Sequence, residues 1–146
     1  MHEERYAESE KMKRELLEIE RHVLGPEHPT TLVTISNLAS TLEQEGRYAE
    51  AEKMQREVLD IERRVLGPEH PLTAISVYNL GGLAAHQGRT NESFSLLRQA
   101  VEHGLPAYAD LGIENDSDLQ SLHSDPRFVA LVADGKERAA AAQKSH

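Results

Sequence analysis

The sequence predicts an all-α protein made of antiparallel helix hairpins that stack into an α-solenoid. Three observations support this prediction. The segment RYAESEKMKRELLEIERHVLGPEHP (5–29) recurs 42 residues later as RYAEAEKMQREVLDIERRVLGPEHP (47–71). Within each copy, apolar residues follow one another at spacings of three and four, as on one face of a helix. Glycine and proline stand at matching places between the helical stretches.

The first element, 5–24, corresponds to the second helix of a hairpin whose first helix is missing. Hairpins of a solenoid bury their apolar faces only against neighbouring hairpins. We therefore expect either further repeats or a second molecule to cover this helix. The residues expected to mediate self-association lie on its apolar stripe, namely Tyr6, Met12, Leu16 and Ile19.

The first full repeat is expected at 29–66. Pro29 suits the first turn of a helix, and Gly46 suits a left-handed helix end. The apolar positions of the first helix are Leu32, Ile35, Leu38, Ala39 and Leu42. Those of the second are Tyr48, Ala51, Met54, Val58, Ile61 and Val65. Gly67 and Pro68 end the repeat, since proline cannot extend the hydrogen-bond ladder.

The second full repeat, 71–104, has the same plan. Gly81 stands where the first repeat has Ala39, and two residues this small would let a neighbouring helix come close. Gly88 ends the first helix, and Gly104 ends the second before Pro106. The apolar positions of the second helix, together with Ser93, are Leu96, Leu97, Ala100 and Val101.

The remaining segment, 105–146, is expected to close the array with degenerate helices, so that 1–146 forms a single domain. Asp116 or Ser117 and the run Ser124-Asp125-Pro126 have the character of helix starts. The residues expected to cover the last hairpin are Leu119, Leu122, Phe128, Leu131 and Val132.

Composition narrows the function classes. The formal net charge is −9 and the pI is about 5.3, which disfavours nucleic acid and anionic membrane surfaces as partners. The chain has no cysteine, so disulfides, thiolate metal sites and cysteine nucleophiles are excluded. Its first residues lack the apolar run of a signal peptide, and no stretch is long enough for a membrane span. We expect a cytoplasmic protein.

Three sequence features resemble the long-period tetratricopeptide repeat (TPR) of the kinesin light chain type. They are LGPEHP at 24–29 and 66–71, the N-L-A or N-L-G step at 37–39 and 79–81, and QEGRYAEAE at 44–52. This resemblance implies hairpins stacked as a right-handed superhelix. The segment after Gly104 is similar to the closing units of bacterial TPR arrays, including arrays that follow serine/threonine kinase domains.

The resemblance also implies a non-catalytic module that binds a protein or peptide partner in a concave groove. In TPR proteins an asparagine at the place of Asn37 and Asn79 often holds the main chain of the bound segment. The other groove candidates are Ser36, Ser40, Gln44, Tyr78 and His86. The alternative role for each asparagine is a bond to neighbouring backbone within the hairpin. These faces carry no lysine or arginine, so we expect an internal or neutral segment, with basic character suited to the acidic domain, rather than a clamped C-terminal carboxylate.

The sequence supports other chemistries poorly. Glu27-His28 and Glu69-His70 offer only two metal ligands per loop, so loop and helix-start roles are favoured over a metal site. No nucleophile elbow or kinase motif is present, and we expect neither enzymatic activity nor a cofactor. Two alternatives to partner capture stay open: a homodimer formed through the open N-terminal helix, or a C-terminal scaffold part of a larger signalling protein.

Overall fold

The computed structural model describes the backbone of residues 2–144 and all of their side chains except those of residues 2–4, 6 and 108. Every regular element in this range is a helix, which confirms the all-α prediction. The elements are α1 (His2–Val23), α2 (Pro29–Gln44), α3 (Tyr48–Val65), α4 (Pro71–His86), α5 (Thr90–Glu102), α6 (Ala107–Gly112), η1 (Ile113–Asn115), η2 (Ser117–Leu122) and α7 (Pro126–Lys144). None of these helices combines the length and the apolar character that crossing a membrane requires.

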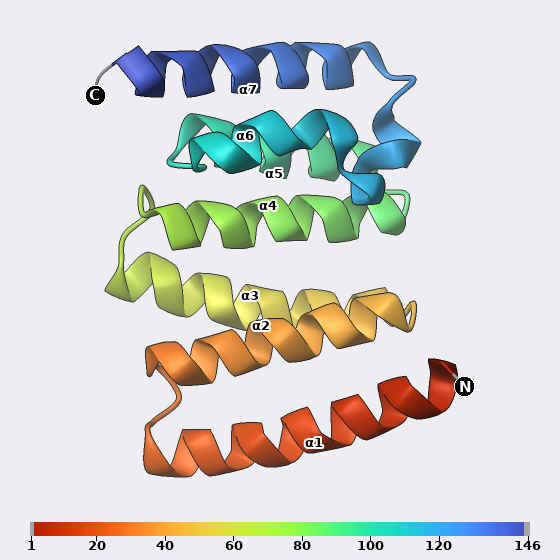
Figure 1. Cartoon of the computed structure of the whole chain (residues 1–146), viewed down its shortest axis with the longest axis vertical. Coiled ribbons are helices and arrows are strands. Elements are labelled where there is room, and N and C mark those ends of the chain that lie inside the picture. The colour runs from red at the N-terminus through yellow and green to blue at the C-terminus, as the bar shows by residue number, and fades with distance from the viewer. Residues whose placement is uncertain (1, 145–146) are drawn as a thin grey trace. The chain divides into compact units, whose positions relative to one another are not determined.

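The chain divides into two compact units, residues 1–61 (unit 1) and 62–146 (unit 2), with the boundary inside α3. In unit 1, α1 and α2 lie in contact and run in opposite directions (Figure 1). The Lys13 ammonium of α1 donates a hydrogen bond to the Thr41 hydroxyl of α2 at 2.6 Å. The fully or nearly fully buried apolar side chains of this unit are Leu17, Ile35, Leu38, Ala39, Leu42, Ala51, Val58 and Leu59.

The repeated LGPEHP sequence builds the same helix start in both copies. His28 precedes α2, and its Nδ1 accepts the backbone N–H of Thr30 at 3.1 Å. His70 precedes α4, and its Nδ1 accepts the N–H of Leu72 at the same distance. Each imidazole therefore satisfies one of the N–H groups that a helix leaves unpaired at its start. The predicted helix-start role of these two histidines is confirmed.

Glycines end the helices as predicted. Gly46 and Gly88 have φ of +79° and +75°, and Gly67 has φ of +94°, in the region where a residue with a Cβ atom is strained.

In unit 2, α4 and α5 form a close hairpin. A Cβ atom added to Gly81 would lie 2.7 Å from Leu97 Cδ2 of α5. One turn earlier on α5, the Ser93 hydroxyl donates to the carbonyl oxygen of Gly81 at 2.7 Å. The predicted close approach at Gly81 is therefore confirmed.

The C-terminal part of unit 2 agrees with the sequence in its helix starts and differs in its helix types. Asp116 and Asp125 accept the N–H groups of Asp118 and Arg127, each at 2.9 Å, so both predicted starts are confirmed. The element after Asp116 is a 3₁₀ helix, η2, and α6 was not predicted. Helix α6 packs on α7, which also contacts α5. The five residues expected to cover the last hairpin are all buried: Leu119, Leu122, Phe128, Leu131 and Val132.

Helix α3 buries more than the predicted apolar stripe. Gln55 and Glu62 are only 4% and 6% exposed, whereas Val65, assigned to the stripe, is 55% exposed. The Ser76 hydroxyl of α4 donates to Glu62 Oε1 at 2.5 Å. Burial raises the pKa of the Glu62 carboxyl, and the hydrogen bond from Ser76 opposes that rise.

Candidate functional site

In unit 1, the groove candidates form one strip along α2, which we call the α2 inner face: Val33, Ser36, Asn37, Ser40 and Gln44. Residues three and four positions apart share a side of a helix, so these side chains point the same way. Ser36 is half-buried, and the other four are exposed. Val33 is 58% exposed, an unusual position for a valine. The strip is therefore uncharged and open, with an apolar residue at one end.

In unit 2, the equivalent strip along α4, the α4 inner face, consists of Ile75, Tyr78, Asn79, Gly82 and His86. Asn79 and His86 are exposed, Ile75 and Tyr78 are half-buried, and Gly82 is buried. The two strips therefore correspond by position in the repeat but differ in how far they are exposed.

The chain's own C-terminal segment covers part of the α4 inner face. The Tyr78 hydroxyl donates to Asp116 Oδ2 at 2.5 Å, and His86 Nε2 lies 3.0 Å from Asp118 Oδ1. Element η2 contacts α4 along this face. Burial and the hydrogen bond to Asp116 raise the pKa of the Tyr78 phenol, so this hydroxyl stays protonated as a donor.

Asn37 and Asn79 retain free amides. Neither side chain has a hydrogen-bond partner within the described part of the chain, and both are exposed. An amide offers both a donor and an acceptor, which suits a peptide backbone. In the alternative role, each amide would bond to backbone within its own hairpin, but no such bond occurs in the described part of the chain.

Helix α1 exposes an apolar stripe. Met12, Leu16 and Ile19 are 69%, 48% and 60% exposed, and Val23, one turn further, is 70% exposed. The side chain of Tyr6, which was predicted with them, lies outside the described residues. At the matching positions of α3, Val58 and Ile61 are buried. The stripe is thus the kind of surface that a repeat normally covers with another helix.

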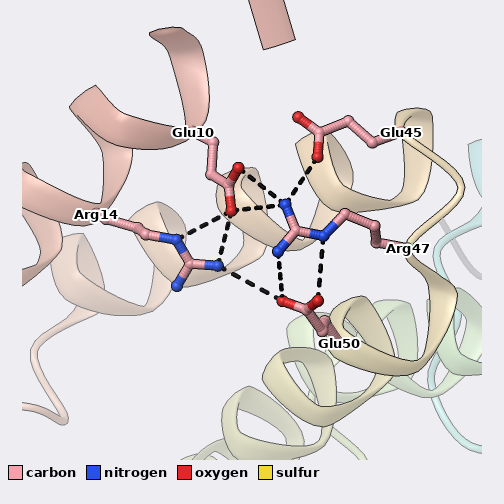
Figure 2. Close-up of polar contacts among 5 residues, drawn as sticks. All are labelled: Glu10, Arg14, Glu45, Arg47 and Glu50. Atoms are coloured by element: carbon pink, nitrogen blue, oxygen red, sulfur yellow. Dashed lines mark hydrogen bonds and ion pairs between the residues drawn. The ribbon is translucent and has the colours of Figure 1, made fainter. Parts of the chain in front are cut away.

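Unit 1 also contains a network of ion pairs that was not predicted from the sequence (Figure 2). Arg47, at the turn between α2 and α3, bonds Glu10 of α1 at 2.8 Å, Glu45 at 3.0 Å and Glu50 at 2.8 Å. Arg14 bonds Glu10 at 2.8 Å and approaches Glu50 to 3.7 Å. Burial works against ionisation of Glu10, yet hydrogen bonds from Arg14 and Arg47 lower its pKa. The network ties α1 to the hairpin turn and is structural in character.

The 42-residue period was the signal that could have revealed part of this network. Arg89 pairs with Glu92 at 2.6 Å as Arg47 does with Glu50, and Arg56 pairs with Glu52 at 3.2 Å as Arg14 does with Glu10. The contact between Arg47 and Glu10 joins residues 37 positions apart. Helical periodicity says nothing about pairs at such a separation.

The repeated helix hairpins define a helical-repeat protein. The profile of the tetratricopeptide repeat family matches residues 1–61 and 31–103, and the chain belongs to this family. No curated protein sequence matches the chain.

Solved structures show the same fold. The crystal structure of BtubC (BKLC) from P. vanneervenii is similar with a TM-score of 0.74 and 19% identity, over 97% of this chain and 59% of that one. A putative kinesin light chain from Podosopora anserina with nearly identical TPR-like repeats is similar with a TM-score of 0.64 and 26% identity, over 91% of this chain and 62% of that one. The predicted TPR solenoid class of the kinesin light chain type is confirmed. The chain spans about 60% of the length of these proteins.

Proposed function

We propose that the chain is a non-catalytic interaction module that binds peptide segments of a partner protein, with the inner face of α2 as one binding face and the inner face of α4 as another. TPR repeats generally mediate protein–protein interaction, and the family is generally non-catalytic. The observation that carries the proposal is the pair of exposed, unbonded amides at matching positions, Asn37 and Asn79. Each amide can accept a hydrogen bond from a main-chain N–H of an extended segment and donate one to a main-chain carbonyl oxygen.

The chemistry of the two strips limits the kind of segment. Neither the α2 inner face nor the α4 inner face carries a lysine or arginine. A C-terminal carboxylate would therefore find no cationic partner on them. An internal segment, recognised through its backbone and through small contacts to Ser36 and Ser40, fits better.

The test uses peptides selected from a random library with the full chain as bait. Replacing Asn37 or Asn79 by Ala should weaken the best peptide about fivefold each, since a neutral hydrogen bond contributes about 1 kcal/mol. Gln143→Ala removes an exposed amide from α7 and should leave the affinity unchanged. Circular dichroism establishes that each variant is folded. Unchanged affinity in a folded Asn37→Ala/Asn79→Ala double variant would remove the assignment.

A second candidate function, self-association, rests on the exposed α1 stripe. Met12, Leu16 and Ile19 would be covered by a second copy in a homodimer. Light scattering after size exclusion is expected to show a dimer that Leu16→Glu converts to monomer. A strict monomer at high concentration would eliminate this candidate.

A third possibility belongs to the context of the chain. The solved relatives are longer than this chain, and a role as the C-terminal scaffold part of a larger signalling protein is compatible with that difference. An upstream coding sequence containing further repeats or a kinase domain would support this role.

A further inference from the structure

Unit 2 contains a cavity of about 280 Å³ that is lined by the last turn of α3, by α4 and by the end of α5. Its apolar wall consists of Ala74 and Val77 of α4 and Ala100 of α5, which are 2%, 4% and 1% exposed. Its polar lining includes Arg63 of α3 and Gln99 of α5, both exposed. None of these residues belongs to the α4 inner face, so the cavity is a separate feature of the repeat.

The apolar wall of this cavity is built from smaller side chains than the equivalent positions of the first repeat. Each wall residue differs from the residue 42 positions earlier: Ala74 replaces Leu32, Val77 replaces Ile35, and Ala100 replaces Val58. Every one of these replacements removes carbon atoms from a region that protein interiors normally fill completely. The second repeat therefore leaves space that the side chains of the first repeat would occupy.

The second repeat also leaves a cation unpaired beside this space. In the first repeat, Arg21 of α1 bonds Glu57 of α3 at 3.0 Å. The residue 42 positions after Glu57 is Gln99, so Arg63, the counterpart of Arg21, finds no carboxylate at this place. Arg63 has no hydrogen-bond or ion-pair partner within the described part of the chain. The smaller wall residues and the unpaired guanidinium are both specific to the second repeat.

The charges around the cavity limit the kind of ligand. Among the described residues that line it, Glu69 carries the only carboxylate. Its Oε1 lies 2.7 Å from His103 Nδ1, and its side chain is 67% exposed, so water and dissolved ions screen its charge. A single unpaired guanidinium beside this group suits a ligand with one negative charge better than a phosphate dianion. The planar fork of the guanidinium matches the two oxygens of a carboxylate.

We propose that this cavity binds a small aliphatic monocarboxylate, with the carboxylate on Arg63 and the aliphatic chain against Ala74, Val77 and Ala100. The amide of Gln99 can donate a further hydrogen bond to the carboxylate. The cavity is slightly smaller than the sites that hold drug-sized ligands, which suits a short chain. This site requires neither inner face and does not depend on the proposed peptide-binding function.

The experiment titrates the full chain with isocaproate, with its neutral amide isocaproamide and with acetate over the millimolar range, and follows amide chemical shifts. Isocaproate should shift Ala74, Val77 and Ala100. It should bind about fivefold more tightly than isocaproamide, the upper end for an exposed ion pair. Acetate should bind about tenfold more weakly than isocaproate, because it leaves the apolar wall uncovered.

Gln99→Glu tests the charged half of the site. It gives Arg63 the carboxylate partner that Arg21 has in the first repeat, and it should weaken isocaproate about fivefold. Arg98→Gln lowers the net charge by the same amount at the neighbouring exposed position of α5 and should leave the affinity unchanged.

Ala74→Leu tests the apolar half of the site. It restores the larger side chain of the first repeat and should fill the cavity, so that isocaproate no longer shifts Val77 and Ala100. Circular dichroism establishes that each variant is folded. The proposal is overturned if isocaproamide binds as tightly as isocaproate, if Gln99→Glu leaves the affinity unchanged, or if a folded Ala74→Leu variant binds as the wild type does. Absence of shifts at the three wall residues in the wild type would overturn it as well.

Discussion

Asp110 is the buried group whose ionisation should most affect the stability of unit 2. It lies in the first turn of α6, and its side chain is 3% exposed. Its Oδ1 has no hydrogen-bond partner among the described residues. Burial raises the pKa of this carboxyl to about 6, with Arg138 of α7 opposing the rise and Asp134 of α7 adding to it. A carboxylate at neutral pH therefore sits in an environment that favours its neutral form.

The sign of the pH effect follows from this direction. The folded chain holds the proton of Asp110 more tightly than the unfolded chain, whose carboxyl titrates near 3.8. The stabilising contribution of the protonated form is complete below pH 3.8 and is lost as the pH rises through about 6. The difference between the two pKa values corresponds to about 3 kcal/mol of unfolding free energy.

Asp110→Asn removes the charge and keeps the shape. Removing the buried charge gains about 3 kcal/mol at pH 8, and burying the amide N–H groups of the new side chain costs about 1–3 kcal/mol. The variant should therefore be more stable than the wild type by about 1 kcal/mol at pH 8. The wild type minus variant difference in unfolding free energy should decrease by about 2.5 kcal/mol between pH 4 and pH 8, because part of the full difference is already lost at pH 4. Urea unfolding followed by circular dichroism at 222 nm measures this difference.

Asp60→Asn, at an exposed carboxyl on α3, is the matched control and should show no such trend. Subtracting the variant from the wild type cancels the titration of all other carboxyls. A difference that stays flat from pH 4 to pH 8, or that increases with pH, would refute the reasoning about Asp110.

Three further predictions concern packing, capping and the ion-pair network. Gly81→Ala should destabilise the folded chain by about 1–3 kcal/mol, because the new Cβ would press on the buried Leu97. Gly82→Ala makes ordinary contacts only and should be neutral or mildly stabilising; thermal melts compare the two variants. His70→Ala should cost about 1 kcal/mol by removing the N-cap of α4, and His70→Asn should restore it; equal melting temperatures of the two variants would contradict the capping role. Arg47→Lys should lower stability measurably at low salt but little at high salt, since a single ammonium lacks the wide planar fork with which the guanidinium reaches three carboxylates; an unchanged loss at high salt would point to packing instead.

The sequence predicted the local features of the fold well because local chemistry determines them. Pro29 and Pro71 begin helices, and Gly46 and Gly88 end them with positive φ, as their backbone preferences require. The cap at Asp116 needs only a carboxylate two residues before an N–H group. Features of this kind depend on neighbours along the chain, and a single sequence contains all of those neighbours.

The long-range polar contacts could not be predicted in this way. Tyr78 meets Asp116 across 38 residues, and the hydrogen bond depends on the path of a 3₁₀ turn that has no strong periodic signal. Ser76 and Glu62 are a similar case, because the predicted apolar stripe of the helix does not include Glu62, which is buried. In each case the partner of a polar side chain comes from a different element of the chain, and periodicity carries no information about that partner.

The second repeat differs from the first at the side chains that meet the turn lying on α4. The lack of a side chain at Gly82 could explain how the turn fits on α4, but a Cβ at this position would make only an ordinary contact of 3.7 Å with Asp118. Glycine is therefore not required for the turn to lie on α4. The bonds from Tyr78 and His86 are specific to the second repeat, because Ser36 and Gln44 at the matching places have neither the reach of a tyrosine hydroxyl nor a group that can become positively charged. The polar contacts that hold the turn on α4 thus involve two side chains for which the first repeat has no equivalent.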